Sequence, residues 1–326
     1  MSTFRKALAA SLEDVPVVVI TGASSGIGRA TAHEYARRSE RLVLASRSAT
    51  ALEPVAAECR VLGAEVRTVA TDVSSEEAVE ALATYAIAHF GRIDVWVGNA
   101  GVMSYGTFER TPPRIFRQVV DTNLMGQVHG ARAVLPHFRR QGHGTLVLVG
   151  SLYSRVGSPQ ISPYVTSKFG LLGFAESLRQ ELRGSGIRLR LILPATIDTP
   201  IYHHAANVTG HRVHPLPPAS SPRRVARAIV RAPHRRRFAT FVGRAQRAGL
   251  LLHGVAPRAY DAVVSFLKHR VELRGDGAKP VSGNVLTPSG VAGAVTGGWR
   301  RWPERIGSGM LVAGAALLIA GVARRR

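Results

Sequence analysis

The sequence predicts an α/β protein built on a parallel sheet, and three short apolar runs support this prediction. Residues 17–20 lead straight into a glycine-rich turn, residues 41–45 follow at the interval of a βαβ unit, and residues 145–149 end at Gly150 and Ser151. Continuous apolar runs of this length, bounded by turn residues, are typical of strands buried on both faces of a sheet. Ligands of such sheets bind beyond the carboxyl ends of the strands, so the residues that follow each run are the candidates for a site.

The turn after the first run has the composition of a phosphate-binding loop. Glycines allow the backbone to approach a pyrophosphate, and the free N–H groups at the start of the next helix attract its charge. The pattern predicts a dinucleotide site, with a tight turn that needs glycine only for positive φ angles as the alternative. The candidate cofactor-binding residues are Thr21, Gly22, Ser24, Ser25, Gly26, Ile27 and Gly28.

The second run ends in Ser46, Arg47 and Ser48. A site that selects NAD usually places an acid here for the ribose 2′-hydroxyl. This sequence has no acid at the position, and a guanidinium flanked by hydroxyls suits a 2′-phosphate instead. We therefore expect NADP(H) as the cofactor, with a surface arginine as the alternative interpretation of Arg47.

Asn123 lies inside an amphipathic helical stretch, where its amide competes for backbone hydrogen bonds. Such a residue can open a helix locally and hold a water, which predicts a proton path between Lys168 and solvent. An exposed or capping asparagine is the alternative.

Tyr164 and Lys168 are four residues apart and so share one face of a predicted helix. A nearby ammonium favours the phenolate, so we expect Lys168 to lower the pKa of Tyr164 toward a value usable at neutral pH. Ser151, at the end of the third run, would hydrogen-bond a substrate carbonyl oxygen beside Tyr164, and Ser154 and Ser158 are its local competitors. The tyrosine and lysine alone also fit an exposed helix, and their companions favour the catalytic interpretation.

Together, these motifs resemble the short-chain dehydrogenase/reductase family over roughly residues 15–243. The chain departs from the family pattern at Gly98, where a second asparagine is common, and at Ala195, where glycine usually follows Pro194. Neither position carries a reacting group. The resemblance rests on Thr21-Gly22-x-x-x-Gly26-x-Gly28, Asp72-Val73, Asn99-Ala100-Gly101, Asn123, Ser151 and Tyr164-x-x-x-Lys168.

The resemblance implies a Rossmann-type, doubly wound parallel sheet with helices on both faces, hydride transfer with a nicotinamide cofactor, no metal, and a homo-dimer or tetramer. Tyr164 would pass a proton to or from the substrate oxygen, which Ser151 would orient. Lys168 would bind the nicotinamide ribose, and Asn123 would position a relay water. Further cofactor contacts would come from Asp72 and Val73 beside the adenine, from Asn99, Ala100 and Gly101 along the cofactor, and from Pro194 and Thr199 near the nicotinamide or pyrophosphate.

The organisation of the chain adds an extension to this catalytic domain. We expect the domain to span 1–243, with an amphipathic helix at 222–230 and a last strand at 238–242, followed by a helical extension at 244–274. Residues 275–305 are rich in Gly, Pro, Ser and Thr and predict a linker.

Residues 306–323 carry no charge and are bracketed by arginines. A helix of this length would span about 27 Å, which predicts a transmembrane anchor, with a Gly/Ala-rich helix buried in a dimer or along the enzyme as the alternative. Residues 1–16 lack the apolar core of a signal peptide. We therefore expect a membrane-associated protein with a cytoplasmic catalytic domain, or alternatively a cytoplasmic protein.

The net charge of +22 comes mostly from scattered arginines. It fits a compositional bias or a surface that faces anionic membrane lipid, and no nucleic-acid motif accompanies it, so we expect no nucleic-acid partner. The single cysteine, Cys59, excludes a disulfide framework. Four histidines between residues 203 and 214 lack acidic neighbours, so we interpret this segment as a mobile substrate lid and not as a metal site.

We predict an NADP(H)-dependent oxidoreductase that interconverts a carbonyl and an alcohol, acting on a lipophilic small molecule. A noncatalytic, NADP(H)-sensing membrane scaffold is the alternative, against which the intact Ser151, Tyr164 and Lys168 argue. The apolar candidates for the substrate pocket are Val102, Met103, Tyr105, Ile161 and Tyr202.

Overall fold

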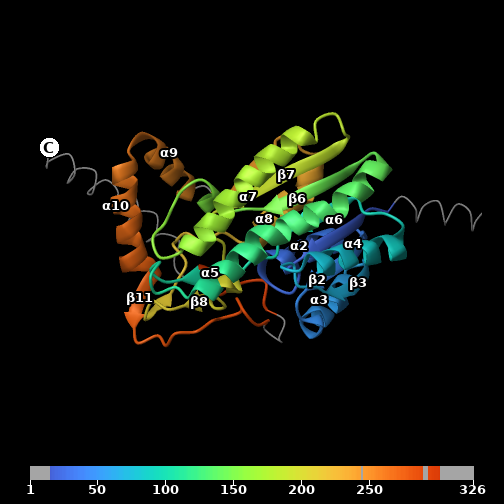
Figure 1. Cartoon of the computed structure of the whole chain (residues 1–326). Coiled ribbons are helices and arrows are strands. Elements are labelled where there is room, and N and C mark those ends of the chain that lie inside the picture. The colour runs from blue at the N-terminus through green and yellow to red at the C-terminus, as the bar shows by residue number, and fades with distance from the viewer. Residues whose placement is uncertain (1–14, 244, 289–292, 302–326) are drawn as a thin grey trace, which may run out of the picture.

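A seven-stranded sheet organises the structure, a computed structural model that describes residues 15–243, 245–288 and 293–301 (Figure 1). All its strand pairs are parallel, in the order β10-β7-β6-β4-β1-β2-β3. The strand order reverses between β1 and β4, which makes this a doubly wound Rossmann-type sheet with its ligand crevice beyond those two strands. The strands are β1 Val17–Thr21, β2 Arg41–Ser46, β3 Glu65–Ala70, β4 Val95–Gly98, β6 Gly144–Val149, β7 Ile187–Pro194 and β10 Ala239–Val242.

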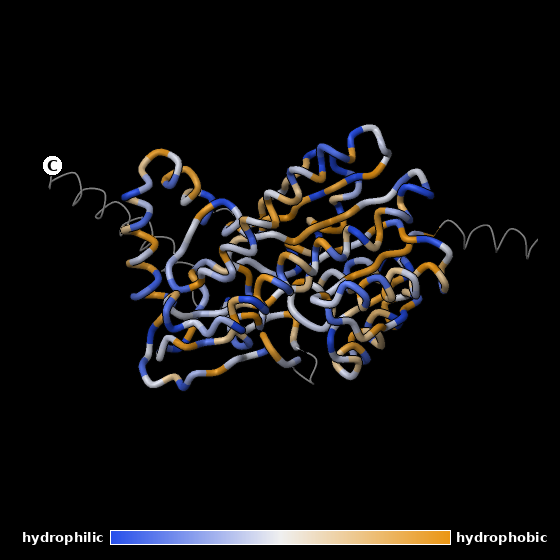
Figure 2. The backbone as a smooth tube through the Cα atoms, in the orientation of Figure 1, coloured by the Kyte–Doolittle hydropathy of each residue, from blue (hydrophilic) through white to orange (hydrophobic). Residues whose placement is uncertain are grey.

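Helices cover both faces of the sheet, as predicted. Successive side chains of a strand point to opposite faces, so Val18 and Ile20 of β1 join one apolar core and Val19 joins the other. Figure 2 shows the resulting apolar strands between helices that also carry polar residues. The first core contains residues of α2 Gly26–Ala36, α3 Ala49–Val61 and α8 Pro222–Arg231, and the second contains residues of α4 Glu76–Phe90, α6 Gly126–Gln141 and α7 Ser162–Glu181.

Helix α5, Pro113–Val120, passes into α6 through a π-helix, Asp121–Met125. This single wide turn is the local opening that the sequence predicts around Asn123. Such turns are rare and are frequent at functional sites.

The extension forms two further helices, which Figure 1 shows standing beside the sheet at one end of the molecule. A second π-helix, Lys268–Glu272, follows them and leads into a strand that pairs with the histidine segment. The two extension helices are α9 Ala248–Val255 and α10 Pro257–Leu267, and the strand is β11 Leu273–Asp276, which pairs antiparallel with β9 His211–Val213. A separate parallel pair joins β5 Ser104–Tyr105 and β8 Ala206–Asn207.

The histidine segment differs from the mobile lid that the sequence predicts. Its strand β8 is paired with β5 and its strand β9 with β11, and the His203 ring stacks on Trp299 with 4.3 Å between ring centroids. Pairing between segments that are far apart in the sequence cannot be predicted from local composition. The segment therefore forms two small paired sheets with distant parts of the chain.

The predicted linker is also different in the structure. Residues 280–288 and 293–301, here called the C-terminal strap, pack on the catalytic domain. Val285 is fully buried, and Asp198 Oδ1 accepts the backbone N–H of Trp299 at 2.9 Å. Composition predicts a linker because glycine and proline are frequent, but distant hydrogen bonds hold the strap in place.

Among the described residues, no helix combines the length and the apolar character that crossing a membrane would require. The predicted anchor at 306–323 and the predicted absence of a signal peptide in 1–16 concern segments that lie wholly or largely outside the described residues. Both stay predictions.

Candidate active site

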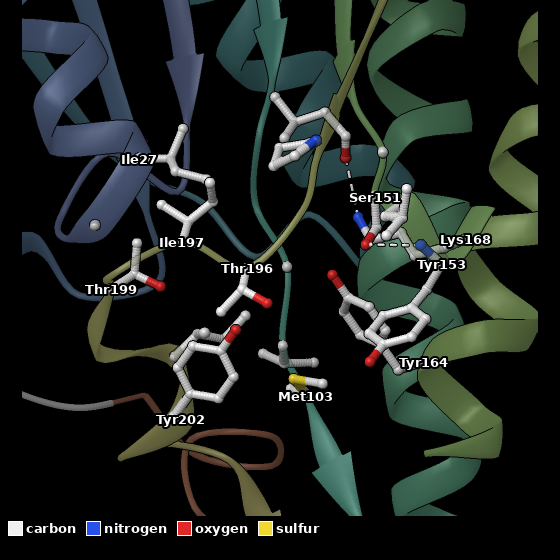
Figure 3. A pocket seen from close by; sticks show the side chains of 18 of the residues that line it. Ile27, Met103, Ser151, Tyr153, Tyr164, Lys168, Thr196, Ile197, Thr199 and Tyr202 are labelled. Carbon is white, nitrogen blue, oxygen red and sulfur yellow. Dashed lines mark hydrogen bonds between the residues drawn. The ribbon is translucent and has the colours of Figure 1, made fainter. Parts of the chain in front are cut away.

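A cavity of about 770 Å³ opens beyond the carboxyl ends of the central strands, at the point where the strand order reverses (Figure 3). It brings together nearly all of the predicted site residues. Thr21, Gly28 and Asn123 do not line it, and their contacts are structural. The predicted site residues that do line it are Gly22, Ser24, Ser25, Gly26, Ile27, Ser46, Arg47, Ser48, Asp72, Val73, Asn99, Ala100, Gly101, Ser151, Tyr164, Lys168, Pro194 and Thr199.

The glycine turn is held against the end of β4. Thr21 Oγ1 accepts the backbone N–H of Asn99 at 3.0 Å, and Asn99 Nδ2 donates to the carbonyls of Thr21 and Gly22. Gly22 has φ +66°, and a Cβ there would lie 2.7 Å from Ala100 Cα. A Cβ on Gly28 would lie 2.0 Å from the Gly22 carbonyl oxygen. Thr21, Asn99 and both glycines thus set the shape of the turn.

The amino end of α2 faces the cavity and also meets the strap. Ser25 is the N-cap residue but its side chain makes no capping hydrogen bond, and the Gly26 N–H donates to Ala294 O at 3.1 Å. Arg29, one turn further on, donates to Gly293 O at 2.9 Å. The strap therefore lies along the helix end that the sequence predicts to bind phosphate.

Arg47 is a half-buried contact residue and not a free surface arginine. Its guanidinium donates to the carbonyls of Asn284 and Val285 in the strap. Burial lowers its pKa, and the nearby charge of Asp72 opposes that shift.

The flanking serines both make local hydrogen bonds. Ser46 Oγ donates to Ser48 O at 3.0 Å, and Ser48 Oγ caps α3 by accepting the Ala51 N–H at 3.2 Å. These bonds hold the backbone beside Arg47 at the cavity wall.

Ser151 and Tyr164 lie side by side in the cavity, as Figure 3 shows. Ser151 begins a short 3₁₀ helix, Leu152–Ser154, and its Oγ accepts the Tyr153 N–H at 3.2 Å. Ser154 completes this capping box and does not line the cavity, and neither does Ser158. Of these three serines, only Ser151 lines the cavity.

The pKa of Tyr164 moves opposite to the sequence prediction. Burial raises it above the ordinary value, and a hydrogen bond with the Ser151 side chain opposes the rise. No lowering by Lys168 accompanies this rise, although the Lys168 ammonium, which donates to Val149 O at 2.9 Å, lies 5.6 Å from the centroid of the Tyr164 ring. Burial also lowers the pKa of Lys168 to about 8. Loss of hydration therefore outweighs the attraction between the two groups.

Asn123 is fully buried and ties three segments together. Its Oδ1 accepts the Val102 N–H at 2.8 Å, and its Nδ2 donates to Val102 O at 2.9 Å and to Ser167 Oγ at 3.2 Å. Because Ser167 precedes Lys168 in α7, Asn123 fixes this helix against the segment after β4. The relay water stays a prediction.

The substrate end of the cavity has walls from both the catalytic domain and the extension. Val102, Met103 and Tyr202 line it as predicted, whereas Tyr105 and Ile161 are buried behind it. Figure 3 shows Tyr202 across the cavity from Tyr153 and Tyr164. Apolar residues at helical spacing were the sequence signal for the extension wall, whereas nothing marked Glu272. The extension residues that line the cavity include Leu252, Tyr260, Val263, Val264, Leu267 and Glu272.

No group of histidine, cysteine and acidic residues suited to a metal ion occurs within the described residues. His203 and His214 pack around Trp299, and His211 pairs with Asp276 at 2.9 Å.

Comparisons with known proteins agree with this geometry. The sequence model of the short chain dehydrogenase family matches residues 16–208. The uncharacterized oxidoreductase YxnA of Bacillus subtilis is 34% identical over 278 residues, which is 84% of this chain and 78% of that protein.

Two solved structures resemble the fold and contain a dinucleotide. A short chain dehydrogenase/reductase from Burkholderia phymatum in complex with NAD has a TM-score of 0.68 and 27% identity, with 82% of this chain and 98% of that chain covered. An alcohol dehydrogenase from Thermococcus sibiricus, complexed with 5-hydroxy-NADP, has a TM-score of 0.62 and 28% identity, with 70% and 96% covered.

Proposed function

This chain belongs to the short chain dehydrogenase family, and we propose that it is an NADP(H)-dependent oxidoreductase that interconverts a carbonyl and an alcohol on a lipophilic substrate. The observation that supports this most is the convergence of Ser151, Tyr164 and Lys168 in one cavity with the glycine turn. A binding module would need the turn but not the three reacting side chains.

The residues present fit a nicotinamide dinucleotide. The cavity runs from Asp72 and Val73 past the amino end of α2 to Tyr164 and Lys168. The Lys168 side chain is 4% exposed, and its ammonium has three donors, of which one bonds Val149 O. Its remaining donors suit the ribose hydroxyls. When bound, the nicotinamide supplies or accepts the hydride.

Tyr164 is the group proposed to exchange the proton with the substrate oxygen. Burial raises its pKa, so the phenol is protonated at neutral pH and can donate when a carbonyl is reduced. Ser151, which lies beside Tyr164 in the cavity, would donate to the same oxygen and hold it in place. In the oxidative direction Tyr164 would accept the proton as the phenolate. The raised pKa makes the phenolate scarcer at neutral pH, so this direction is favoured less.

NADP(H) is proposed over NAD(H) because of the end of β2. Arg47 and its two flanking serines line the cavity, and this position has no acid for a ribose 2′-hydroxyl. A 2′-phosphate here would attract the Arg47 guanidinium, whose present partners are the strap carbonyls of Asn284 and Val285. The two structural neighbours hold different dinucleotides, so the proposal rests on this chain's own residues.

The proposed lipophilic substrate follows from the wall that the extension provides. Leu252, Val263, Val264 and Leu267 of the extension line the cavity, as does Met103 of the catalytic domain. Apolar pockets of this kind gain affinity from the apolar surface of their ligands.

The test is oxidation of NADPH by the purified full chain with aromatic, steroidal and long-chain carbonyls, beside the variant Tyr164→Phe. We expect turnover that the variant loses by roughly 10²- to 10⁴-fold, with NADPH affinity retained. Tyr85→Phe, a tyrosine of α4 that does not line the cavity, is the matched control. NADPH binding without turnover across the panel would instead favour the sensing scaffold.

A further inference from the structure

The π-helix of the extension carries a buried ion pair that the proposed reaction does not use. Lys268 Nζ lies 2.6 Å from Glu272 Oε2, and the two side chains are 0% and 3% exposed. Tyr105 OH donates to Glu272 Oε1 at 2.7 Å, and the Lys268 ammonium lies over the Tyr105 ring. Moving two charges out of water costs free energy, and such a pair often stabilises a protein no better than apolar residues would. Its position next to a cavity therefore suggests a role in binding.

The pair has unused hydrogen-bonding capacity. The Lys268 ammonium lies 2.6 Å from Glu272 Oε2, and Tyr105 OH donates to Glu272 Oε1, so each carboxylate oxygen has one partner. A carboxylate can accept about four hydrogen bonds. With one partner on each oxygen, the Glu272 carboxylate can accept about two more hydrogen bonds, which a ligand in the cavity can supply.

Glu272 belongs to the wall of the cavity, whereas Lys268 lies behind it. Tyr153 and Tyr202 lie between Glu272 and the end of the cavity that contains Tyr164. The Tyr153 ring packs edge-on against Tyr164 with 6.3 Å between centroids. Burial raises the pKa of Tyr153 and of Tyr202, and the negative charge of Glu272 raises both further. Both rings also pack in one cluster with Tyr105, whose hydroxyl bonds Glu272, and with Leu273, the residue after Glu272 in the chain.

We propose that Glu272 is a polar subsite which receives a hydroxyl group of the substrate, at the end of the molecule away from the reacting carbonyl. The subsite would make a hydroxylated, otherwise apolar ketone the preferred substrate class. This inference deepens the proposed function and rests on it.

A neutral donor suits the subsite better than a cation. The positive charge of Lys268 nearly cancels that of Glu272, and a substrate ammonium would lie near the Lys268 ammonium as well. A hydroxyl can donate to the carboxylate without bringing a charge into the cavity. Met103 and Leu267, which line the same cavity as Glu272, suit the apolar part of such a molecule.

The experiment measures binding separately from turnover. Isothermal calorimetry on the full chain loaded with NADP⁺ compares 2-alkanones with ω-hydroxy-2-alkanones of the same length, over a graded series. We expect the hydroxyl to improve affinity roughly tenfold to a hundredfold at the chain length that reaches Glu272. In the double variant Lys268→Met/Glu272→Leu this ratio should fall to about one, because an apolar pair fills the same space.

A matched double variant removes an exposed ion pair, Arg155→Met/Glu176→Leu, whose side chains lie 3.1 Å apart and do not line the cavity. It should keep the preference. If the first double variant does not fold, Glu272→Gln replaces it and should reduce the ratio, since a neutral acceptor bonds less strongly than a carboxylate.

The proposal is overturned if no hydroxyketone binds better than its parent ketone, if none of the series binds, or if the variant at Glu272 keeps the full preference. NADPH oxidation is measured on the same samples. A preference for the hydroxyketones without any turnover would contradict the proposed reaction but would still support the subsite at Glu272.

Discussion

Replacing Asn123 by alanine should destabilise the protein strongly. The substitution removes the partner of the Val102 N–H and of the Val102 carbonyl, both in a buried segment, and one bond to Ser167. A buried backbone group left without a partner costs about 1–3 kcal/mol. Two such groups give about 2–6 kcal/mol, and we expect about 2–4 kcal/mol because water can enter the space left by the amide.

Urea unfolding of Asn123→Ala, followed by circular dichroism, measures this loss. For a domain of this size the corresponding fall in Tm is about 5–15 °C. Gln180→Ala is the matched control, since Gln180 makes one exposed bond on α7 and its loss should change stability by no more than about 0.5 kcal/mol. A loss below about 1 kcal/mol in Asn123→Ala would refute the structural role assigned to this amide.

Two further predictions concern the cofactor. Arg47→Ala should lower the ratio of kcat/KM with NADPH to kcat/KM with NADH by roughly tenfold to a hundredfold, because a charge-assisted contact to the 2′-phosphate is lost. The control is Arg67→Ala, which replaces an exposed residue of β3. An unchanged ratio in Arg47→Ala would contradict the role of Arg47. Burial lowers the pKa of Lys168 to about 8, so its ammonium is present below that pH and is lost as the pH rises through it. The Kd of NADPH, followed by fluorescence, should therefore rise above pH about 8 in the native protein and stay flat in Lys168→Met, and a flat native profile would argue against Lys168 as a cofactor contact.

The sequence predicted the parts of the site that depend on local patterns. The first apolar run, the glycine turn and the Tyr164 and Lys168 pair are each specified within a few residues, so β1, α2 and α7 occur where expected. The doubly wound order of the sheet followed from the family resemblance and is confirmed.

What could not be predicted depends on distant contacts. Lys268 and Glu272 look like an ordinary solvated pair on a helix, because i,i+4 spacing says nothing about burial. The predicted lowering of the Tyr164 pKa was wrong for the same reason. The ring loses its hydration only when distant segments enclose the cavity, and this loss raises the pKa.

The strap also has a consequence for how the protein is made. Arg29 and its partner Gly293 are separated by 264 positions, and Gly26 bonds the neighbouring Ala294. At roughly 5–20 residues per second, a ribosome needs about 13–53 s to synthesise the chain between Arg29 and Gly293. The glycine turn is thus among the first described parts to be synthesised, whereas the segment that closes over it is among the last. During synthesis the nucleotide crevice stays open, and its final form depends on the latest and most non-local contacts of the fold.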